Sequence, residues 1–80
     1  MSDNLQKYKE AFKETFELKD SDDIDNLKYQ SIDSWDSIGH MTLMSALESA
    51  FSITLETDDI IDFSSFKKGI EILKKYKVLI

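Results

Sequence analysis

The chain has 80 residues, a formal net charge of −6 and no cysteine. This length allows one small domain, so we expect residues 1–80 to form a single unit. The composition excludes disulfides, thiolate metal sites and a thiol supplied by the chain itself, and no apolar run is long enough to span a membrane. The polar start MSDNLQKYKE argues against a secretory signal, so we expect a cytoplasmic protein.

The first predicted helix runs from Asn4 to Leu18. Its apolar residues recur every three or four positions, which places them on one helical face: Leu5, Tyr8, Phe12 and Phe16. The segment from residue 19 to 36 follows, and it is rich in Asp, Ser and Asn, residue types that favour turns and caps. Scattered apolar residues, among them Trp35, predict that this long loop is anchored across the core.

A second helix is predicted from about Ser37 to Phe51, with Asp36 as its N-cap. Leu43, Leu47 and Phe51 form one apolar ridge along it. Two further apolar residues lie around the side of that ridge: Ile38 and Met41. The helix is therefore apolar on more than one face, and the excess requires either a second neighbour or a visiting partner.

The stretch DDIIDF predicts a short turn of helix, with acidic residues suited to a helix N-terminus. A last helix begins after Ser64 or Ser65, either of which can cap it. Its buried face is marked by Phe66, Ile70 and Leu73. These elements predict an all-α fold: a small four-helix bundle with a long loop between helices 1 and 2 and a short third helix.

Charge is unevenly distributed. No Lys or Arg occurs between Lys28 and Lys67, an interval that holds many acidic residues. This disfavours nucleic acid as a partner and favours proteins with basic patches, although a solvated acidic surface that aids solubility is an equally simple interpretation.

The residues allow three possible functions to be considered: catalysis, metal binding and membrane association. Ser37 and His40 lie three apart and can share a helix face, but a serine nucleophile also needs a third group and an oxyanion hole, so we expect no enzyme. The stretch DSDDID lacks the Gly and Glu of a calcium loop, so we expect a solvated turn and no metal. FKKGIEILKKYKVLI resembles a surface helix, but its apolar residues are needed for the core, so we expect no stable membrane insertion.

The segment DSIGHMTLMSALESAFSITLETDDIIDFSSFKKGIEIL, from Asp36 to Leu73, resembles the acyl carrier protein family. Three motifs fit the family pattern without gaps: Asp36-Ser37-Ile38, Leu47-Glu48-x-x-Phe51 and Ile53-x-Leu55. A short acidic helix and a serine that opens the last helix follow in register. The first helix matches by length and apolar spacing, so the resemblance covers nearly the whole chain.

The resemblance implies that Ser37 carries 4'-phosphopantetheine, attached from coenzyme A by a phosphopantetheinyl transferase. The thiol of this arm would hold acyl groups as thioesters, which agrees with the absence of cysteine. Asp36 would cap the helix and help the transferase or its metal engage the site. An anionic phosphodiester is also favoured at a helix N-terminus by free N–H groups and the helix dipole.

The resemblance also implies roles for other residues. Contacts with partner enzymes, which would activate and transfer acyl or aminoacyl groups, are expected at Ile38, His40, Met41, Glu48 and Ile60. The core, into which short acyl chains can retreat, would be lined by Leu43, Leu47, Phe51, Ile61, Phe66 and Ile70. We expect the carrier to be a monomer.

The sequence departs from fatty-acid carriers at several positions. Ser34-Trp35 replaces the usual Gly-x, and Thr42 and Ser49 stand where those carriers often have Glu. The pattern is more similar to stand-alone carriers of specialised lipid, surface-sugar or secondary-metabolite pathways. Two alternatives stay open: an aminoacyl or D-alanyl carrier, in which a glycine such as Gly39 also follows the triplet, and a helical interaction module that is never modified.

Overall fold

The computed structural model describes residues 3–19 and 22–80. Its elements, in chain order, are α1 (Asn4–Phe16), a 3-10 turn η1 (Ile24–Asn26), α2 (Ser37–Phe51), α3 (Thr57–Asp62) and α4 (Phe66–Lys74). In these described ranges the only β-type pairing is one isolated antiparallel bridge. The prediction of an all-α chain with four helices is therefore confirmed.

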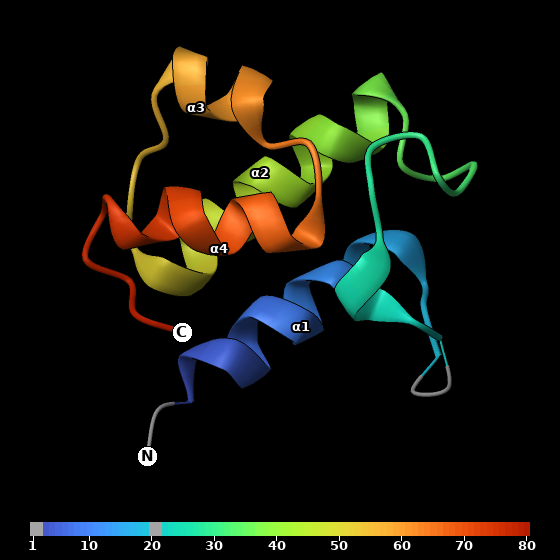
Figure 1. The fold of residues 1–80 in the computed structure, drawn as a ribbon, viewed down its shortest axis with the longest axis horizontal. Helices are drawn as coiled ribbons and strands as arrows, with labels where there is room; N and C mark the ends of the chain where they lie inside the picture. Colours follow the sequence, from blue (N-terminus) through green and yellow to red (C-terminus); the bar gives the residue numbers. More distant parts are fainter. Residues whose placement is uncertain (1–2, 20–21) are drawn as a thin grey trace.

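Figure 1 shows how the helices are arranged. α1 and α2 run in opposite directions and pack along each other, and α4 crosses in front of α2. The short α3 lies at the opposite side of the molecule from α1. The start of α1 and the C-terminus lie on the same side, where the Asn4 side-chain amide donates a hydrogen bond of 2.9 Å to the Leu79 carbonyl.

Aromatic rings form the centre of the core. The ring of Phe12 lies 5.0 Å from Tyr8, 5.5 Å from Trp35 and 5.2 Å from Phe66, measured between centroids. All three contacts are edge-to-face, an arrangement that the ring quadrupole favours. α1 therefore contributes its aromatic face to contacts with the loop and with α4.

Two details of α1 differ from the sequence-based expectation. The helix ends at Phe16 rather than Leu18, because Glu17 adopts the left-handed conformation with φ of 55°. Leu5 is 39% exposed, so its assignment to the buried face is wrong. It lies in the first turn of α1.

The long loop between α1 and α2 is anchored, as predicted. Ile24, Leu27 and Trp35 are buried in the core. The loop also pairs with the start of α4: the Tyr29 N–H donates to the Ser64 carbonyl at 2.8 Å, and the Phe66 N–H donates to the Leu27 carbonyl at 2.9 Å. Both its side chains and its backbone therefore fix the loop to the bundle.

The predicted caps of α2 and α4 are present. The Asp36 carboxylate accepts a hydrogen bond of 2.8 Å from the Gly39 N–H, and the Ser65 hydroxyl accepts one of 2.9 Å from the Lys68 N–H. Each side chain satisfies a first-turn N–H that the helix itself leaves without a partner. Of the two serines considered for α4, Ser65 is the cap.

The predicted core residues separate into three groups. Leu43, Leu47 and Phe66 are buried, and Phe51 and Ile70 are half-buried against the core. The expectation that Ile61 lies in the core is wrong, because its side chain is 72% exposed. Consecutive helical residues point about 100° apart, so the short α3 cannot direct both Ile60 and Ile61 inward. Ile60 is the one that packs against the core.

Candidate functional site

Ser37 is the first residue of α2, and its side chain is exposed. Its Oγ lies 3.2 Å from the hydroxyl oxygen of Tyr29, so the two hydroxyls share a hydrogen bond. Asp36 immediately precedes it as the N-cap of α2 and is also exposed. The structure therefore brings together the two residues singled out for the cofactor and adds Tyr29, which no sequence motif indicated.

The backbone before Ser37 is positioned by a close contact with α2. A Cβ added to Gly39 would overlap the carbonyl oxygen of Ser34 and lie 3.2 Å from Cε1 of Phe16. Only glycine lets the loop approach α2 so closely. The glycine after the Asp-Ser-apolar triplet thus has a packing reason in this chain, independent of any cargo.

His40 is half-buried and joins three parts of the fold. Its Nδ1 accepts a hydrogen bond of 3.0 Å from the indole N–H of Trp35. Nδ1 therefore carries no proton, so Nε2 carries it and donates to the Ile60 carbonyl at 2.8 Å. His40 is therefore not a freely exposed histidine, because both ring nitrogens are bonded within the fold; its contact with a partner enzyme stays a prediction. The two ring nitrogens of His40 bind Trp35 and Ile60 rather than Ser37, so Ser37 and His40 do not form a nucleophile–base pair.

An open cleft of about 370 Å³ borders Ser37. It lies between the end of the long loop, α2, α3 and the segment before α4. Its lining residues are Tyr29, Ser37, His40, Met41, Ile60, Ile61, Phe63 and Ser64. Most of these side chains are apolar or aromatic, and they include no charged carboxylate, lysine or arginine. The cleft can therefore accept a neutral, largely apolar group that reaches it from Ser37.

Exposed apolar side chains lie at this cleft and next to Ser37. Met41 and Ile61, which line the cleft, are 51% and 72% exposed, and Ile38, which follows Ser37 in the chain, is 79% exposed. Of the residues expected to contact partners, Ile38 and Met41 therefore lie at the surface, and the exposed Ile61 joins them. An accessible apolar group beside an exposed serine is typical of an interaction surface.

Glu48 and Ile60 have roles inside the fold. The Glu48 carboxylate accepts a hydrogen bond of 2.8 Å from the Leu55 N–H, which ties the end of α2 to the connection that follows. Ile60 is half-buried, and its carbonyl holds His40. Contacts of these two residues with partner enzymes stay predictions.

Asp59 is a buried charged residue that the sequence did not single out. It is only 6% exposed, and its carboxylate accepts short hydrogen bonds from the Lys75 ammonium and the Tyr76 hydroxyl. The hydrogen bond from Lys75, followed by that from Tyr76, lowers the pKa of the Asp59 carboxyl below its ordinary value. The bond to Asp59 raises the pKa of Lys75, and desolvation raises that of Tyr76. This cluster fastens α3 to the segment after α4.

We expect Asp59→Asn to make stability less dependent on pH. Because the pKa of Asp59 is lower in the folded than in the unfolded chain, its carboxylate stabilises the fold above the unfolded value. That contribution is lost as pH falls through the lowered pKa, so wild type should exceed the variant in free energy of unfolding at neutral pH and lose this advantage below about pH 4. Urea denaturation at neutral and acidic pH measures the difference.

The matched control is Asp58→Asn, the same change on an exposed residue of α3. It should alter the free energy of unfolding at neutral pH by less than about 0.5 kcal/mol. An advantage of wild type over Asp59→Asn that is equally large at neutral and acidic pH would contradict the assignment of the Asp59 carboxylate.

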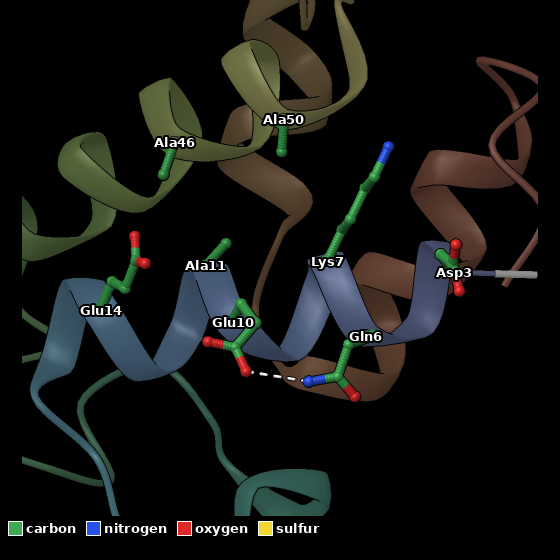
Figure 2. A pocket seen from close by; sticks show the side chains of 8 residues that line it. All are labelled: Asp3, Gln6, Lys7, Glu10, Ala11, Glu14, Ala46 and Ala50. Atoms are coloured by element: carbon green, nitrogen blue, oxygen red, sulfur yellow. Dashed lines mark hydrogen bonds between the residues drawn. The ribbon is translucent and has the colours of Figure 1, made fainter.

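A separate groove of about 370 Å³ runs between α1 and α2 (Figure 2). Its floor is formed by Ala11, Ala46 and Ala50, and polar side chains such as Lys7 and Glu14 stand along its rim. The Gln6 amide donates to Glu10 along α1 rather than into the groove. The lining residues do not form a set of reactive groups. The groove is explained by the small alanine side chains, which leave space where α1 and α2 pack against each other.

The structure also bears on metal binding and on membrane association. Residues 3–19 and 22–80 contain no group of three or more His, Cys, Asp or Glu side chains that could hold a metal ion. Asp20 and Ser21, part of the acidic stretch DSDDID, lie outside the described residues. Among the described helices, none has the length and apolar character needed to cross a membrane.

Comparisons with known proteins supply no relative from which a role can be transferred. No family model matches the chain, and no curated protein or solved structure matches it significantly. The chemistry of Ser37 and its surroundings is therefore the basis for assigning a function.

Proposed function

We propose that this protein is a discrete carrier that holds acyl intermediates as thioesters on a 4'-phosphopantetheine arm attached to Ser37. One observation carries the proposal: an exposed serine hydroxyl opens a capped helix at the rim of an open, largely apolar cleft. The attached arm supplies a thiol, which the chain lacks because it has no cysteine. The protein itself is not an enzyme in this proposal.

The residues around Ser37 fit a phosphodiester. The first-turn N–H groups and the positive end of the α2 dipole favour an anion at this position. Asp36 is exposed beside the serine, where it can meet a transferase and the metal ion that such an enzyme uses. The Asp36 carboxylate also fixes the first turn through the Gly39 N–H, so the Ser37 hydroxyl is presented from a rigid helix end.

Attachment needs no base within this chain. The Ser37 Oγ–phosphorus bond forms as the bond between the two linked phosphates of coenzyme A breaks. Adenosine 3',5'-bisphosphate leaves, and the serine proton passes to a base of the transferase. A base supplied by the transferase agrees with the position of His40, whose ring nitrogens are bonded to Trp35 and to Ile60 rather than to Ser37.

The nature of the cleft favours an acyl cargo over an aminoacyl one. Met41, Ile61 and Phe63 line it, and none of its side chains is a carboxylate that would pair with an ammonium group. Ile38 and Met41 remain exposed for transient contact with the enzymes that load and unload the arm. The same exposed residues also suit a permanent partner, which makes an unmodified interaction module the second candidate.

The test is a mass measurement after incubation with coenzyme A and a phosphopantetheinyl transferase of broad specificity. Wild type should gain one phosphopantetheine, and Ser37→Ala should gain none. Ser34→Ala is the matched control, because Ser34 is also exposed and also follows an aspartate, and it should be modified completely. An unchanged mass for folded wild type with several transferases would remove the carrier proposal and favour the interaction module.

A further inference from the structure

Tyr29 lies beside the proposed attachment point, although no sequence motif indicated it. Its hydroxyl oxygen lies 3.2 Å from Ser37 Oγ, and both residues line the same cleft. They are eight positions apart in the chain, and they belong to different parts of the fold: Tyr29 to the anchored loop and Ser37 to α2. The contact is therefore a product of tertiary structure and not of helix geometry.

The position of the Tyr29 ring is fixed from several sides. It makes edge-to-face contacts with Trp35 and His40, with centroids 6.4 Å and 5.4 Å away. His40 is in turn held by hydrogen bonds at both ring nitrogens. The Tyr29 backbone N–H donates to the Ser64 carbonyl at 2.8 Å. A hydroxyl on a ring held in this way stays beside Ser37 when the serine changes chemically.

Esterification of Ser37 would change which partner can donate. The serine oxygen loses its proton when its bond to phosphorus forms, so in the Tyr29–Ser37 pair only the tyrosine then has a proton to give. The ester oxygen is a weaker acceptor than the anionic phosphate oxygens beside it, and hydrogen bonds to such charged acceptors are the stronger ones. Those oxygens would be joined through phosphorus to Ser37 Oγ, which lies 3.2 Å from the Tyr29 hydroxyl oxygen.

The cleft offers no positively charged side chain that could bind a phosphate. The residues that line the cleft include no lysine or arginine, and none occurs between Lys28 and Lys67 in the sequence. A phosphate on Ser37 would therefore depend on neutral donors, among them the first-turn N–H groups of α2 and the Tyr29 hydroxyl.

We propose that Tyr29 is a positioning residue for the covalent arm: its hydroxyl donates to the phosphate on Ser37 and holds the start of the arm over the cleft between α2 and α3. This inference rests on the proposed function, because it requires a phosphodiester at Ser37. It goes beyond that function by assigning a specific donor and a direction to the arm.

The experiment compares unmodified and modified protein in wild type and in Tyr29→Phe, which keeps the ring and removes only the hydroxyl. Urea denaturation gives the unfolding equilibrium constant of each form. If Tyr29 donates to the phosphate, attachment should lower this constant about fivefold more in wild type than in Tyr29→Phe, the effect of one hydrogen bond. A purely structural role of the hydroxyl would affect both forms equally and leave the change on attachment the same.

Tyr76→Phe is the matched control, because its hydroxyl binds Asp59 and the Glu56 N–H rather than Ser37. It should weaken both forms while the change on attachment matches wild type. Phosphorus NMR of the modified proteins gives a second measurement: the phosphodiester resonance should move in Tyr29→Phe and not in Tyr76→Phe.

The outcomes separate the two proposals. Failure of wild type to accept the arm would overturn the proposed function and the role of Tyr29 together. Complete modification of Ser37, with equal stability changes and equal phosphorus resonances in wild type and Tyr29→Phe, would leave the carrier function intact and overturn the role of Tyr29 alone.

Discussion

Replacing Trp35 with alanine should remove about 3–5 kcal/mol from the free energy of unfolding, the range for deleting a large buried aromatic side chain. The indole is fully buried, stacks on Phe16 with centroids 5.3 Å apart and meets Phe12 edge-to-face. Its N–H also satisfies Nδ1 of His40. Because small domains are stable by only about 5–15 kcal/mol, a large share of the stability of this fold should depend on one loop residue.

Urea denaturation followed by far-ultraviolet circular dichroism measures this effect. Ile38→Ala is the control three residues away: its side chain is 79% exposed, so the free energy of unfolding should change by less than about 0.5 kcal/mol. If Trp35→Ala proved as stable as Ile38→Ala, the anchoring of the long loop to the core would be wrong.

Gly69→Ala should also destabilise the fold, by less than Trp35→Ala. The expected net loss in the free energy of unfolding is about 2 kcal/mol. A Cβ at this position would overlap the Tyr8 hydroxyl and Cζ of Phe63, and would lie 2.7 Å from Cε1 of the Phe63 ring. Both rings are fully buried, so neither can move away easily. Alanine favours the helix by about 1 kcal/mol over glycine, and this gain only partly offsets the overlap.

The Tyr8 hydroxyl has its own role in this crowded region. It donates a hydrogen bond of 2.6 Å to the Phe66 carbonyl, and burial raises the pKa of Tyr8, so the hydroxyl remains a neutral donor. The double variant Tyr8→Phe/Gly69→Ala should therefore lose less stability than the two single changes added together, because removing the hydroxyl makes room for the new methyl group.

Thermal and urea denaturation of the four proteins in this cycle provide the measurement, with Lys68→Ala on the exposed side of α4 as the control for alanine in the helix. A Gly69→Ala protein at least as stable as wild type would mean that the contact between α1 and α4 is looser than the structure describes.

Local patterns in the sequence predicted most of the helical framework. Asp36 and Ser65 precede apolar periodic segments, and such side chains cap helices for reasons that act within three residues, so α2 and α4 begin where expected. Trp35 was correctly expected to be buried, because so large an apolar residue in a polar loop has few other ways to leave water.

Several features that the sequence did not predict depend on contacts formed by the tertiary fold. Periodicity cannot decide whether Ile60 or Ile61 faces inward on a helix of six residues, since that choice depends on how α3 is tilted against its neighbours. His40 was misjudged because its partners are an indole in the preceding loop and a carbonyl in α3. Asp59 was overlooked because its partners Lys75 and Tyr76 are 16 and 17 positions away and contact it only in the packed fold.

The candidate site was predictable in part for the same reason. Asp36 and Ser37 are adjacent in the chain and belong to a local helix start, so a motif can indicate them. Tyr29 and the cleft between α2 and α3 result from the path of the loop, which no local pattern specifies. Whether Ser37 carries the arm is a chemical question, and the mass measurement answers it directly.

The burial of Trp35 also gives this protein a built-in optical probe. It is the only tryptophan in the chain, so intrinsic fluorescence excited at the red edge of protein absorption comes from a single position. Its indole N–H is bonded to His40, which lies in the first turns of the helix that Ser37 opens. A change in emission wavelength or lifetime would therefore report on the surroundings of Trp35, which include the start of α2, and an unlabelled sample could be followed in real time as Ser37 reacts.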